Sequence, residues 1–317
     1  MKFLITDFDF PDVELEKALF REAALQLDVA QCRTEDDVIA AGKGYSGFMT
    51  QYTPMNAKVF AALPELRIVS RFGAGFDTVN TGDAEKFGVW VANSPDYGVG
   101  EVATHALGMA LALVRHLPFY DRDIRTDHWH YTSAGPLRRV KEMTLGIVGL
   151  GRIGKRMAHL SREAFRSVIA CDPYIPDSGF PPFVRRVSLD DCFRHADVVS
   201  LHTPLNDETR HLAGEHTLGL MRRGSFLVNT SRGAVADVDA VLAALDSGRL
   251  EAAALDVLPQ EPPPRGHPVL RHPRVLLTPH AAFYSVEGEK ELRRKAAQNV
   301  IDWARTGRPT YVVVEGR

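Results

Sequence analysis

The stretch TLGIVGLGRIGKRMAHLSREAF, residues 144–165, decides the fold of this sequence. It begins as an apolar, β-rich run, passes through a glycine-rich turn and continues as a helical pattern. The turn has the spacing G-x-G-x-x-G, which alone is a weak signal. Asp172, however, ends the next predicted strand about 18 residues after the last of these glycines. A strand, this turn, a helix and a later acid together are typical of a Rossmann unit that binds a dinucleotide.

Each position of the motif has a predicted task. Gly149 permits a tight turn, Gly151 lets backbone amides approach a pyrophosphate, and Gly154 lets the helix pack on the strand. The pyrophosphate is expected at the helix N-terminus, where the helix dipole favours negative charge. Asp172 would accept hydrogen bonds from the ribose hydroxyls and would repel a 2′-phosphate, so NAD is favoured over NADP. The alternative is that Asp172 merely ends a strand. The predicted dinucleotide contacts here are Gly149, Gly151, Arg152, Ile153, Gly154, Asp172 and Pro173.

Outward from the motif, short apolar strands alternate with helical patterns on both sides. The alternation fills residues 1–98, stops at a long apolar helix over 101–116 and an irregular stretch over 117–142, and then resumes. Unbroken apolar strands between helices predict parallel sheets that are covered on both faces. Arg185 and Arg186 are expected in a loop separate from the dinucleotide site.

The predicted fold class is therefore α/β, with two doubly wound parallel-sheet domains. A Rossmann domain, residues 99–282, would be inserted into a flavodoxin-like domain formed by residues 1–98 and 283–317. The tail, residues 309–317, would return to pair with the first sheet. The two crossings of the chain would form a hinge.

Composition narrows the class of protein. The 317 residues are 45% hydrophobic and 25% charged, with a formal net charge of −2, which suits a globular protein and disfavours direct binding to nucleic acid or to anionic membrane. Three widely spaced cysteines fit no metal-ligand pattern and suit a reducing compartment. The longest apolar stretch, residues 106–114, is about half a membrane span. The N-terminus is too short and too charged for a signal peptide. A cytoplasmic location is expected.

Three polar side chains follow consecutive predicted strands. Arg232 comes after SFLVNTS, Glu261 lies in the loop after EAAALDV, and His280 ends VLLTPH. Because ligands of open parallel sheets bind beyond the carboxyl ends of the strands, these residues are expected on one rim. The arginine fork can bind a carboxylate, and the histidine can give a proton near neutral pH. Glu261 would favour the imidazolium. Singly, the three could be a turn-capping arginine, a surface glutamate and a core histidine.

At this point a family resemblance is visible. The motifs LGIVGLGRIG, LVNTSRGAVAD, AALDVLPQEP and LLTPHAAF, with the early loop RFGAGFDTVN and the segment VGE, resemble the D-isomer-specific 2-hydroxyacid dehydrogenases over essentially the whole chain. RFGAGFD, DPY, FLVNTSRG and TPHAAFYS are most similar to the C-terminal-binding-protein subgroup. Those are NAD-binding dehydrogenase-like proteins, some of which act as transcriptional corepressors.

The resemblance implies a set of residue roles. The catalytic residues would be Arg232, Glu261 and His280, with Arg232 binding substrate and His280 as the acid/base. Further cofactor contacts would be His202, Thr203, Pro204, Thr230, Ser231, Arg232, Asp256 and His280, with Asp256 near the nicotinamide carboxamide. The substrate would contact Arg71, Gly73, Ala74, Gly75, Arg232 and Phe283, with the loop amides holding its carboxylate. The family is usually a homodimer, and residues 117–142 lie where dimer contacts would fall.

Two positions depart from the family pattern. Asn80 stands where many members have aspartate, which makes capping of the following helix an open question. Phe283 replaces a tryptophan that is common in the subgroup, so its ligand preference does not carry over directly. Gln51, Tyr52, Phe72, Phe76 and Phe283 would shape the pocket, and their character favours an aliphatic or aromatic 2-oxo acid over a dicarboxylate.

The resulting prediction is an NAD-dependent oxidoreductase acting on CH–OH, which moves a hydride reversibly between NADH and a small 2-oxo acid in the cleft between the domains. One alternative is an NAD(H)-sensing, corepressor-like scaffold with vestigial turnover. Another is a short-form phosphoglycerate dehydrogenase, or a phosphite-oxidising relative, which would need extra cations for its substrate. Arg71 is the one obvious candidate for such a cation in the first domain.

Overall fold

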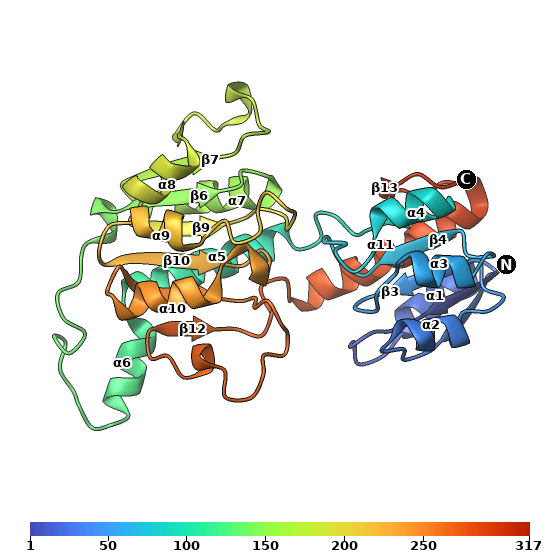
Figure 1. The fold of residues 1–317 in the computed structure, drawn as a ribbon, viewed down its shortest axis with the longest axis horizontal. Helices are drawn as coiled ribbons and strands as arrows, with labels where there is room; N and C mark the ends of the chain where they lie inside the picture. Colours follow the sequence, from blue (N-terminus) through green and yellow to red (C-terminus); the bar gives the residue numbers. More distant parts are fainter. The chain divides into compact units, whose positions relative to one another are not determined.

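The computed structural model describes residues 1–317, which form two compact units (Figure 1). The first unit is built from Met1–Gly98 and Ser285–Arg317, and the second from Val99–Tyr284. The chain re-enters the first unit slightly after the predicted position, so Phe283 lies in the second unit. Each unit is a sheet between layers of helices, which confirms the predicted two-domain α/β class.

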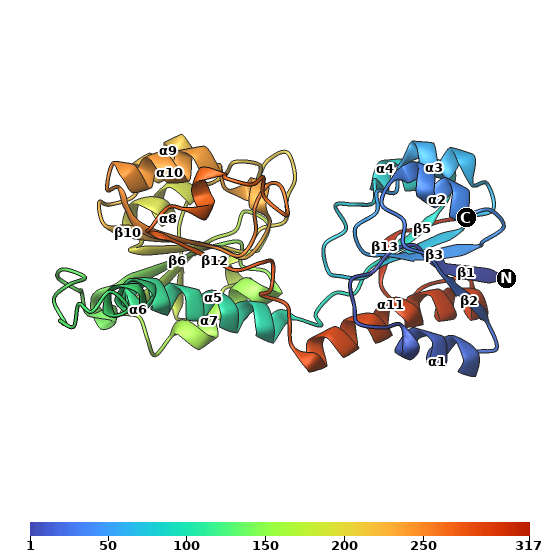
Figure 2. The same cartoon turned by 90° about the horizontal axis from the view of Figure 1, so that it is seen from below.

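The first unit contains a six-stranded sheet in the order β13-β5-β4-β3-β1-β2. Figure 2 shows α1 and α11 on one face of this sheet and α2, α3 and α4 on the other. All neighbouring strands are parallel except β13, which pairs antiparallel with β5, so the tail does return to this sheet as predicted. The elements are β1 (Lys2–Ile5), α1 (Glu14–Glu22), β2 (Gln26–Val29), α2 (Glu35–Ala41), β3 (Gly47–Thr50), α3 (Ala57–Ala62), β4 (Ile68–Arg71), α4 (Thr81–Phe87), β5 (Trp90–Ala92), α11 (Val286–Thr306) and β13 (Val312–Val314).

Two details stabilise the first unit. The Asn80 side chain accepts a hydrogen bond from the Asp83 amide, so asparagine caps α4 where the family often has aspartate. Arg293 of α11 reaches the fully buried Glu16 of α1, with Nη2 and Oε2 2.8 Å apart. This buried ion pair joins the C-terminal helix to the beginning of the chain.

The second unit contains a seven-stranded parallel sheet in the order β12-β11-β10-β9-β6-β7-β8. Helices α5 and α7 cover one face, and α8, α9 and α10 cover the other (Figure 2). The elements are α5 (Val99–Val114), α6 (Leu117–Ile124), β6 (Thr144–Val148), α7 (Arg152–Ser161), β7 (Ser167–Cys171), β8 (Val184–Arg186), α8 (Leu189–His195), β9 (Val198–Leu201), α9 (Glu215–Leu220), β10 (Ser225–Asn229), α10 (Val238–Asp246), β11 (Leu250–Leu255) and β12 (Val275–Leu277).

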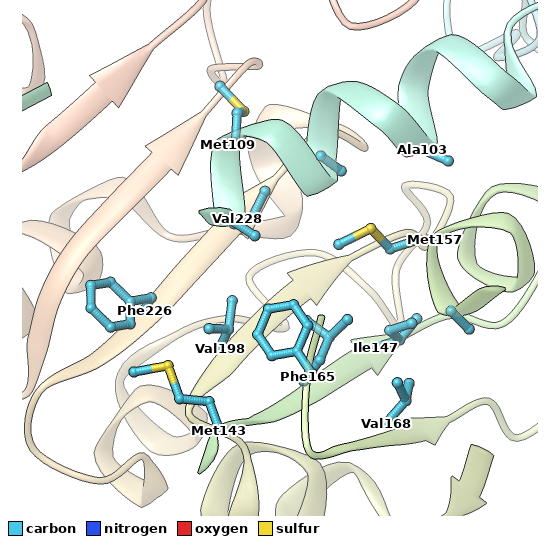
Figure 3. Packing of buried hydrophobic residues seen from close by; sticks show 14 of the residues in the cluster. Ala103, Met109, Met143, Ile147, Met157, Phe165, Val168, Val198, Phe226 and Val228 are labelled. Atoms are coloured by element: carbon cyan, nitrogen blue, oxygen red, sulfur yellow. The ribbon is translucent and has the colours of Figure 1, made fainter. Parts of the chain in front are cut away.

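Helix α5 is held against the second sheet by a dense apolar cluster (Figure 3). Ala103 and Met109 of α5 belong to the same buried cluster as Met157 of α7 and Val228 of β10. The small alanines on α5 permit close approach to the strands, and fully buried side chains fix a helix in one position. Helix α5 is therefore a rigid base for the side chains that it carries.

The structure corrects two local predictions. Arg185 and Arg186 lie on β8, an edge strand paired with β7, and not in a loop. A three-residue edge strand with exposed charges gives almost no periodic signal, and charges on an edge discourage pairing with other chains. The stretch predicted as irregular contains the helix α6, which begins at Leu117 and has Pro118 in its first turn.

No single helix is long and apolar enough to cross a membrane. The bent pair formed by α5 and α6 meets that test by length and composition only.

Candidate active site

Two glycines of the glycine-rich turn are required by contacts within the protein, and the third borders open space. At Gly149, where φ is +89°, an added Cβ would lie 2.6 Å from the carbonyl oxygen of His202. At Gly154 it would lie 2.1 Å from the Gly149 oxygen, so neither position accepts a side chain. At Gly151, by contrast, no protein atom beyond the adjacent residues lies within 4 Å of such a Cβ. This open space adjoins the N-terminus of α7, which has no side-chain cap, and it suits a pyrophosphate.

Asp172 is fixed beside this turn at the end of β7. Its Oδ2 accepts a hydrogen bond from the Leu150 amide at 2.8 Å, and its Oδ1 accepts one from the Tyr174 amide at 3.0 Å. Arg186, on the neighbouring strand β8, pairs with Asp177 at 2.5 Å. An anchored carboxylate at this place suits ribose hydroxyls and disfavours a 2′-phosphate.

The residues after β9 and β10 leave polar atoms without protein partners. The buried hydroxyls of Thr203 and Thr230 have no hydrogen-bond partner within the chain. Because buried polar groups are nearly always paired, these hydroxyls indicate that a bound group completes the site. His202 bonds through Nε2 to Ser200 Oγ at 2.9 Å, and burial lowers its pKa to about 4, so the ring is neutral at physiological pH. The residues present therefore fit a dinucleotide.

Arg232 follows β10 in a loop that packs directly on the next loop of the site. The Asn229 side chain accepts a hydrogen bond from the Ser231 amide at 3.0 Å and donates one to the Arg232 carbonyl at 2.9 Å. At Gly233, an added Cβ would lie 1.9 Å from the Leu258 carbonyl carbon. Only glycine permits this approach, which joins the arginine loop to the segment that leads to Glu261.

His280 and Glu261 form a hydrogen-bonded pair, with Nδ1 and Oε2 2.6 Å apart. The other glutamate oxygen accepts a hydrogen bond from the Leu258 amide at 2.8 Å. Burial alone would raise the pKa of Glu261. The hydrogen bond and charge of His280, the Leu258 amide and the charge of Arg232 outweigh burial, and the pKa is lowered. The three residues predicted to be catalytic are thus electrostatically linked.

Asp256 organises the turn that carries His280. This carboxylate is 2% exposed and accepts hydrogen bonds from the Ala281 amide at 2.8 Å and the Ala282 amide at 3.0 Å. The Asp256 carbonyl accepts one from the His280 amide at 2.7 Å. His280 has a φ of +54°, a left-handed conformation that is uncommon outside glycine, so these bonds hold a strained turn. Phe283 lies beside His280, with ring centroids 6.4 Å apart.

Sequence reasoning missed two polar contacts of Asp256. His105 of α5 lies 3.1 Å from Thr278 Oγ1 and 3.7 Å from Asp256 Oδ1, measured from its Nε2. Thr278 Oγ1 in turn bonds to Asp256 Oδ1 at 2.5 Å. A single histidine in an apolar helix gives no sequence signal of this kind.

Within the whole chain, no group of three or more His, Cys, Asp or Glu side chains is placed to hold a metal ion.

The predicted substrate loop lies in the first unit, after β4. Gly73 has a φ of +148°, and an added Cβ would lie 1.3 Å from Arg71 Nη1, so the guanidinium lies across this glycine. The Gly73 amide donates to the Arg71 carbonyl at 3.0 Å, which leaves the amides of Ala74 and Gly75 as the candidate donors to a carboxylate. Phe72 is 1% exposed and packs on Phe10, so it does not shape a pocket as predicted.

The ends of β1 and β3 carry a polar network instead of an apolar wall. The Tyr52 hydroxyl donates to Asp9 Oδ2 at 2.7 Å, and Gln51 Nε2 donates to Asp9 Oδ1 at 2.6 Å. Burial, together with the hydrogen bond to Asp9, raises the pKa of Tyr52, so this hydroxyl keeps its proton. Behind it, the buried Asp7 accepts hydrogen bonds from the Gln51 and Tyr52 amides.

Comparisons with known proteins agree with this site. Residues 107–282 match the family described as "D-isomer specific 2-hydroxyacid dehydrogenase, NAD binding domain". A glyoxylate reductase of Korarchaeum cryptofilum is 36% identical over 82% of this chain and 80% of its own length. A D-3-phosphoglycerate dehydrogenase of Bacillus subtilis is 32% identical over 80% of this chain but only 48% of its own length. The crystal structure of a D-lactate dehydrogenase of Treponema pallidum has a TM-score of 0.81 and 27% identity, and the match covers 99% of each chain.

The glycine turn with its anchored acid, the linked arginine, glutamate and histidine, and these matches lead to one assignment. The chain belongs to the D-isomer specific 2-hydroxyacid dehydrogenase family and is an NAD-dependent oxidoreductase that acts on CH–OH groups.

Proposed function

We propose that this protein reduces a small 2-oxo acid to a D-2-hydroxy acid, reversibly, with NADH as the hydride donor. The observation that carries the proposal is the 2.6 Å bond between His280 Nδ1 and Glu261 Oε2. It fixes the orientation of the imidazole and its protonation at Nδ1, so that Nε2 is the nitrogen that exchanges a proton with the substrate. A histidine whose second nitrogen is held by a carboxylate is a typical general acid/base.

The reaction divides into tasks for the chain's own residues. When bound, the reduced nicotinamide supplies the hydride to C2 of the substrate. His280 Nε2 donates a proton to the carbonyl oxygen as that oxygen gains negative charge. Glu261 stabilises the imidazolium before the transfer, since its lowered pKa keeps it ionised. Arg232 binds the substrate carboxylate and polarises the carbonyl.

The first unit is proposed to recognise the substrate through the loop after β4. The amides of Ala74 and Gly75, with the Arg71 guanidinium across Gly73, form a small set of anion donors at the end of β4. We propose that this unit, Met1–Gly98 with Ser285–Arg317, is the substrate domain, and that Val99–Tyr284 is the cofactor domain. Phe283 is proposed as a substrate contact because it lies against His280.

A direct test is a panel of 2-oxo acids assayed with NADH and with NADPH. The panel contains glyoxylate, pyruvate, 2-oxoisocaproate, phenylpyruvate and oxaloacetate, and chiral analysis identifies the product. We expect NADH-dependent reduction to a D-product by the wild type and a rate at least about 100-fold lower for His280→Asn. An L-product, or equal rates with His280→Asn, would contradict the proposed mechanism.

The phosphoglycerate alternative is less well supported. A phosphate substrate requires several cations, but the rim of the first unit places the Asp9 carboxylate beside Tyr52 and Gln51. This carboxylate would repel a phosphate that lay near it. Oxidation of D-3-phosphoglycerate with NAD, measured beside oxidation of D-lactate and glycolate, separates the two functions.

The scaffold alternative depends on the likeness to the C-terminal-binding-protein subgroup, which rests on the motifs RFGAGFD, DPY and TPHAAFYS. The subgroup remains a proposal. An organised acid/base pair is unnecessary for a pure scaffold, so the geometry of His280 and Glu261 favours an enzyme. Tight NADH binding without turnover on any 2-oxo acid would instead favour the scaffold.

We also propose a homodimer formed by the segment 117–142. Trp129 and Tyr131 in this segment are each 82% exposed, and Leu117 is 56% exposed. Such a concentration of exposed apolar side chains on one segment is typical of an interface. Light scattering on the full chain tests the proposal, and we expect a dimer for the wild type and a monomer for a Trp129→Glu, Tyr131→Glu double variant.

A further inference from the structure

We propose that His105 is a positioning residue for His280, acting through Thr278 and Asp256. The inference rests on the proposed function, because it takes His280 as the acid/base. It adds a residue from α5 that no motif of the family resemblance includes. His105 lies on α5, Asp256 follows the end of β11, and Thr278 and His280 follow the end of β12. Asp256 joins these segments by hydrogen bonds.

The direction of each hydrogen bond in this chain follows from counting protons. Thr278 has a single hydroxyl proton, and Asp256 Oδ1, 2.5 Å away, can only accept while the carboxylate is ionised. The hydroxyl therefore accepts from its other neighbour, His105 Nε2, at 3.1 Å. His105 must carry a proton on Nε2 for this bond to form. The result is one directed chain from the imidazole through the hydroxyl to the carboxylate.

At its other end, this series of hydrogen bonds reaches the strained turn at His280. The same oxygen, Asp256 Oδ1, also accepts from the Ala281 amide, and Oδ2 accepts from the Ala282 amide. A carboxylate that is oriented by Thr278 on one side presents fixed acceptors to these amides on the other. Those amides follow His280, whose left-handed φ of +54° must be stabilised by its surroundings.

The His105 end of this series of hydrogen bonds is attached to a tightly packed helix. His105 lies two residues after Ala103, which is fully buried in the cluster between α5, α7 and the sheet (Figure 3). The imidazole is thus attached to a helix that packing holds in place. Its side chain is only 27% exposed, so water replaces it poorly as a donor to Thr278. His105 transmits the rigidity of α5 to the turn that carries the proton donor.

Loss of the His105 side chain is expected to lower the reaction rate. A displacement of about 1 Å in a catalytic group lowers the rate about 100-fold, even when the substitution is remote from the chemistry. Without the His105 donor, Thr278 can turn its hydroxyl away from Asp256, and the amides of Ala281 and Ala282 lose a fixed partner. His280 would then be misaligned for proton transfer, while the dinucleotide turn at 149–154 is unaffected.

The experiment compares six full-length proteins: wild type, His105→Leu, His105→Gln, Thr278→Val, the Leu/Val double variant and one control. Glutamine places an amide donor close to the position of Nε2 and serves as the conservative rescue. His116→Asn, just beyond α5 at the N-cap of α6, is the control, since it changes a half-buried histidine with no link to Asp256. Asparagine tolerates the left-handed φ of +53° at this position. Measured are kcat and KM with the best 2-oxo acid, the Kd for NADH, and Tm.

We expect His105→Leu to lower kcat about 10- to 100-fold while the Kd for NADH changes by less than about threefold. His105→Gln should recover most of the rate, and the double variant should be no slower than the slower single variant, because both substitutions break one chain. The His116→Asn control should keep the wild-type kcat.

Three results would overturn the inference: an unchanged kcat in His105→Leu, equal losses in the Leu and Gln variants, or a loss of rate matched by an equal loss of NADH affinity. The proposed function is judged separately with His280→Asn. If that variant is inactive while His105→Leu is fully active, only the role of His105 is wrong. If His280→Asn is as active as the wild type, both the mechanism and this inference are wrong.

Discussion

The two sheets of this protein both carry polar side chains at the carboxyl ends of their strands, but they hold them differently. In the second unit, His280 is bonded to Glu261, and Asp256 fixes its turn from behind. In the first unit, Asp9 and Tyr52 bond to each other at an exposed edge. Both pairs are exposed and both are backed by a buried aspartate, Asp256 or Asp7. Only the second unit holds its pair on a strained, left-handed turn, at His280.

This difference suggests a division of labour. Groups that move protons must be held in a fixed geometry before the substrate arrives, whereas groups that recognise a substrate can adjust to it. Substitutions in the second rim should therefore act mainly on kcat. Substitutions in the first rim should act mainly on KM.

The largest effect is expected for His280→Ala. Loss of the general acid should lower kcat/KM by about 10²- to 10⁴-fold, because the developing alkoxide is left without a positioned proton donor. The Kd for NADH, measured by fluorescence titration, should stay within about threefold of the wild-type value. A loss confined to NADH binding would show that the histidine serves the cofactor and not the reaction.

A stability effect comes next, in the first unit alone. Arg293→Ala removes the partner of the fully buried Glu16, and an uncompensated buried charge costs about 3–5 kcal/mol. Thermal unfolding of the full chain should show a clearly lowered Tm. Arg125→Ala is the control, since it breaks an exposed pair with Asp121 that contributes about 1 kcal/mol or less. Equal shifts in both variants would contradict the assigned importance of the buried pair.

In the second unit, His202 is expected to make the free energy of unfolding depend on pH. His202 has a folded pKa of about 4, below its ordinary value of 6.5. The unfolded chain therefore binds a proton that the folded chain rejects, and stability contributed by the neutral ring is lost as pH falls from 6.5 towards 4. His202→Gln should flatten this dependence relative to wild type in urea unfolding at each pH. Parallel curves for the two proteins would show that other groups cause it.

The smallest effect is expected for Tyr52→Phe in the first rim. It removes one hydrogen bond to Asp9, and a net loss of about 0.5–1.5 kcal/mol corresponds to a change in KM of about two- to tenfold. The kcat should stay within about twofold. A selective collapse of kcat would place Tyr52 among the groups that take part in the chemistry and would blur the division between the two rims.

Much of the second unit could be predicted from the sequence, because its motifs report local requirements of the backbone. Gly149 and Gly154 are glycines since any side chain would meet a carbonyl oxygen. Asp172 follows a strand whose end must lie beside that turn. Such constraints are written in adjacent residues, so one sequence is enough to find them.

The rest could not be predicted because it depends on contacts between distant residues. Nothing near His105 indicates that Thr278 will lie against it. Phe72 looks like a pocket residue by its position after β4, but its partner, Phe10, turns it into the core. The strand β8 cannot be recognised from its arginines, because three residues are too few to show a strand period.

The insertion of one unit into the other has a consequence for biosynthesis. Residues 1–98 leave the ribosome first, yet α11, which covers one face of their sheet, and β13, which closes its edge, come last. Glu16 has no cation to neutralise it in the folded core until Arg293 has been translated. The dinucleotide-binding unit is continuous in sequence and can close around its own core earlier. During translation, the unit Val99–Tyr284 is thus complete before the unit formed by Met1–Gly98 and Ser285–Arg317.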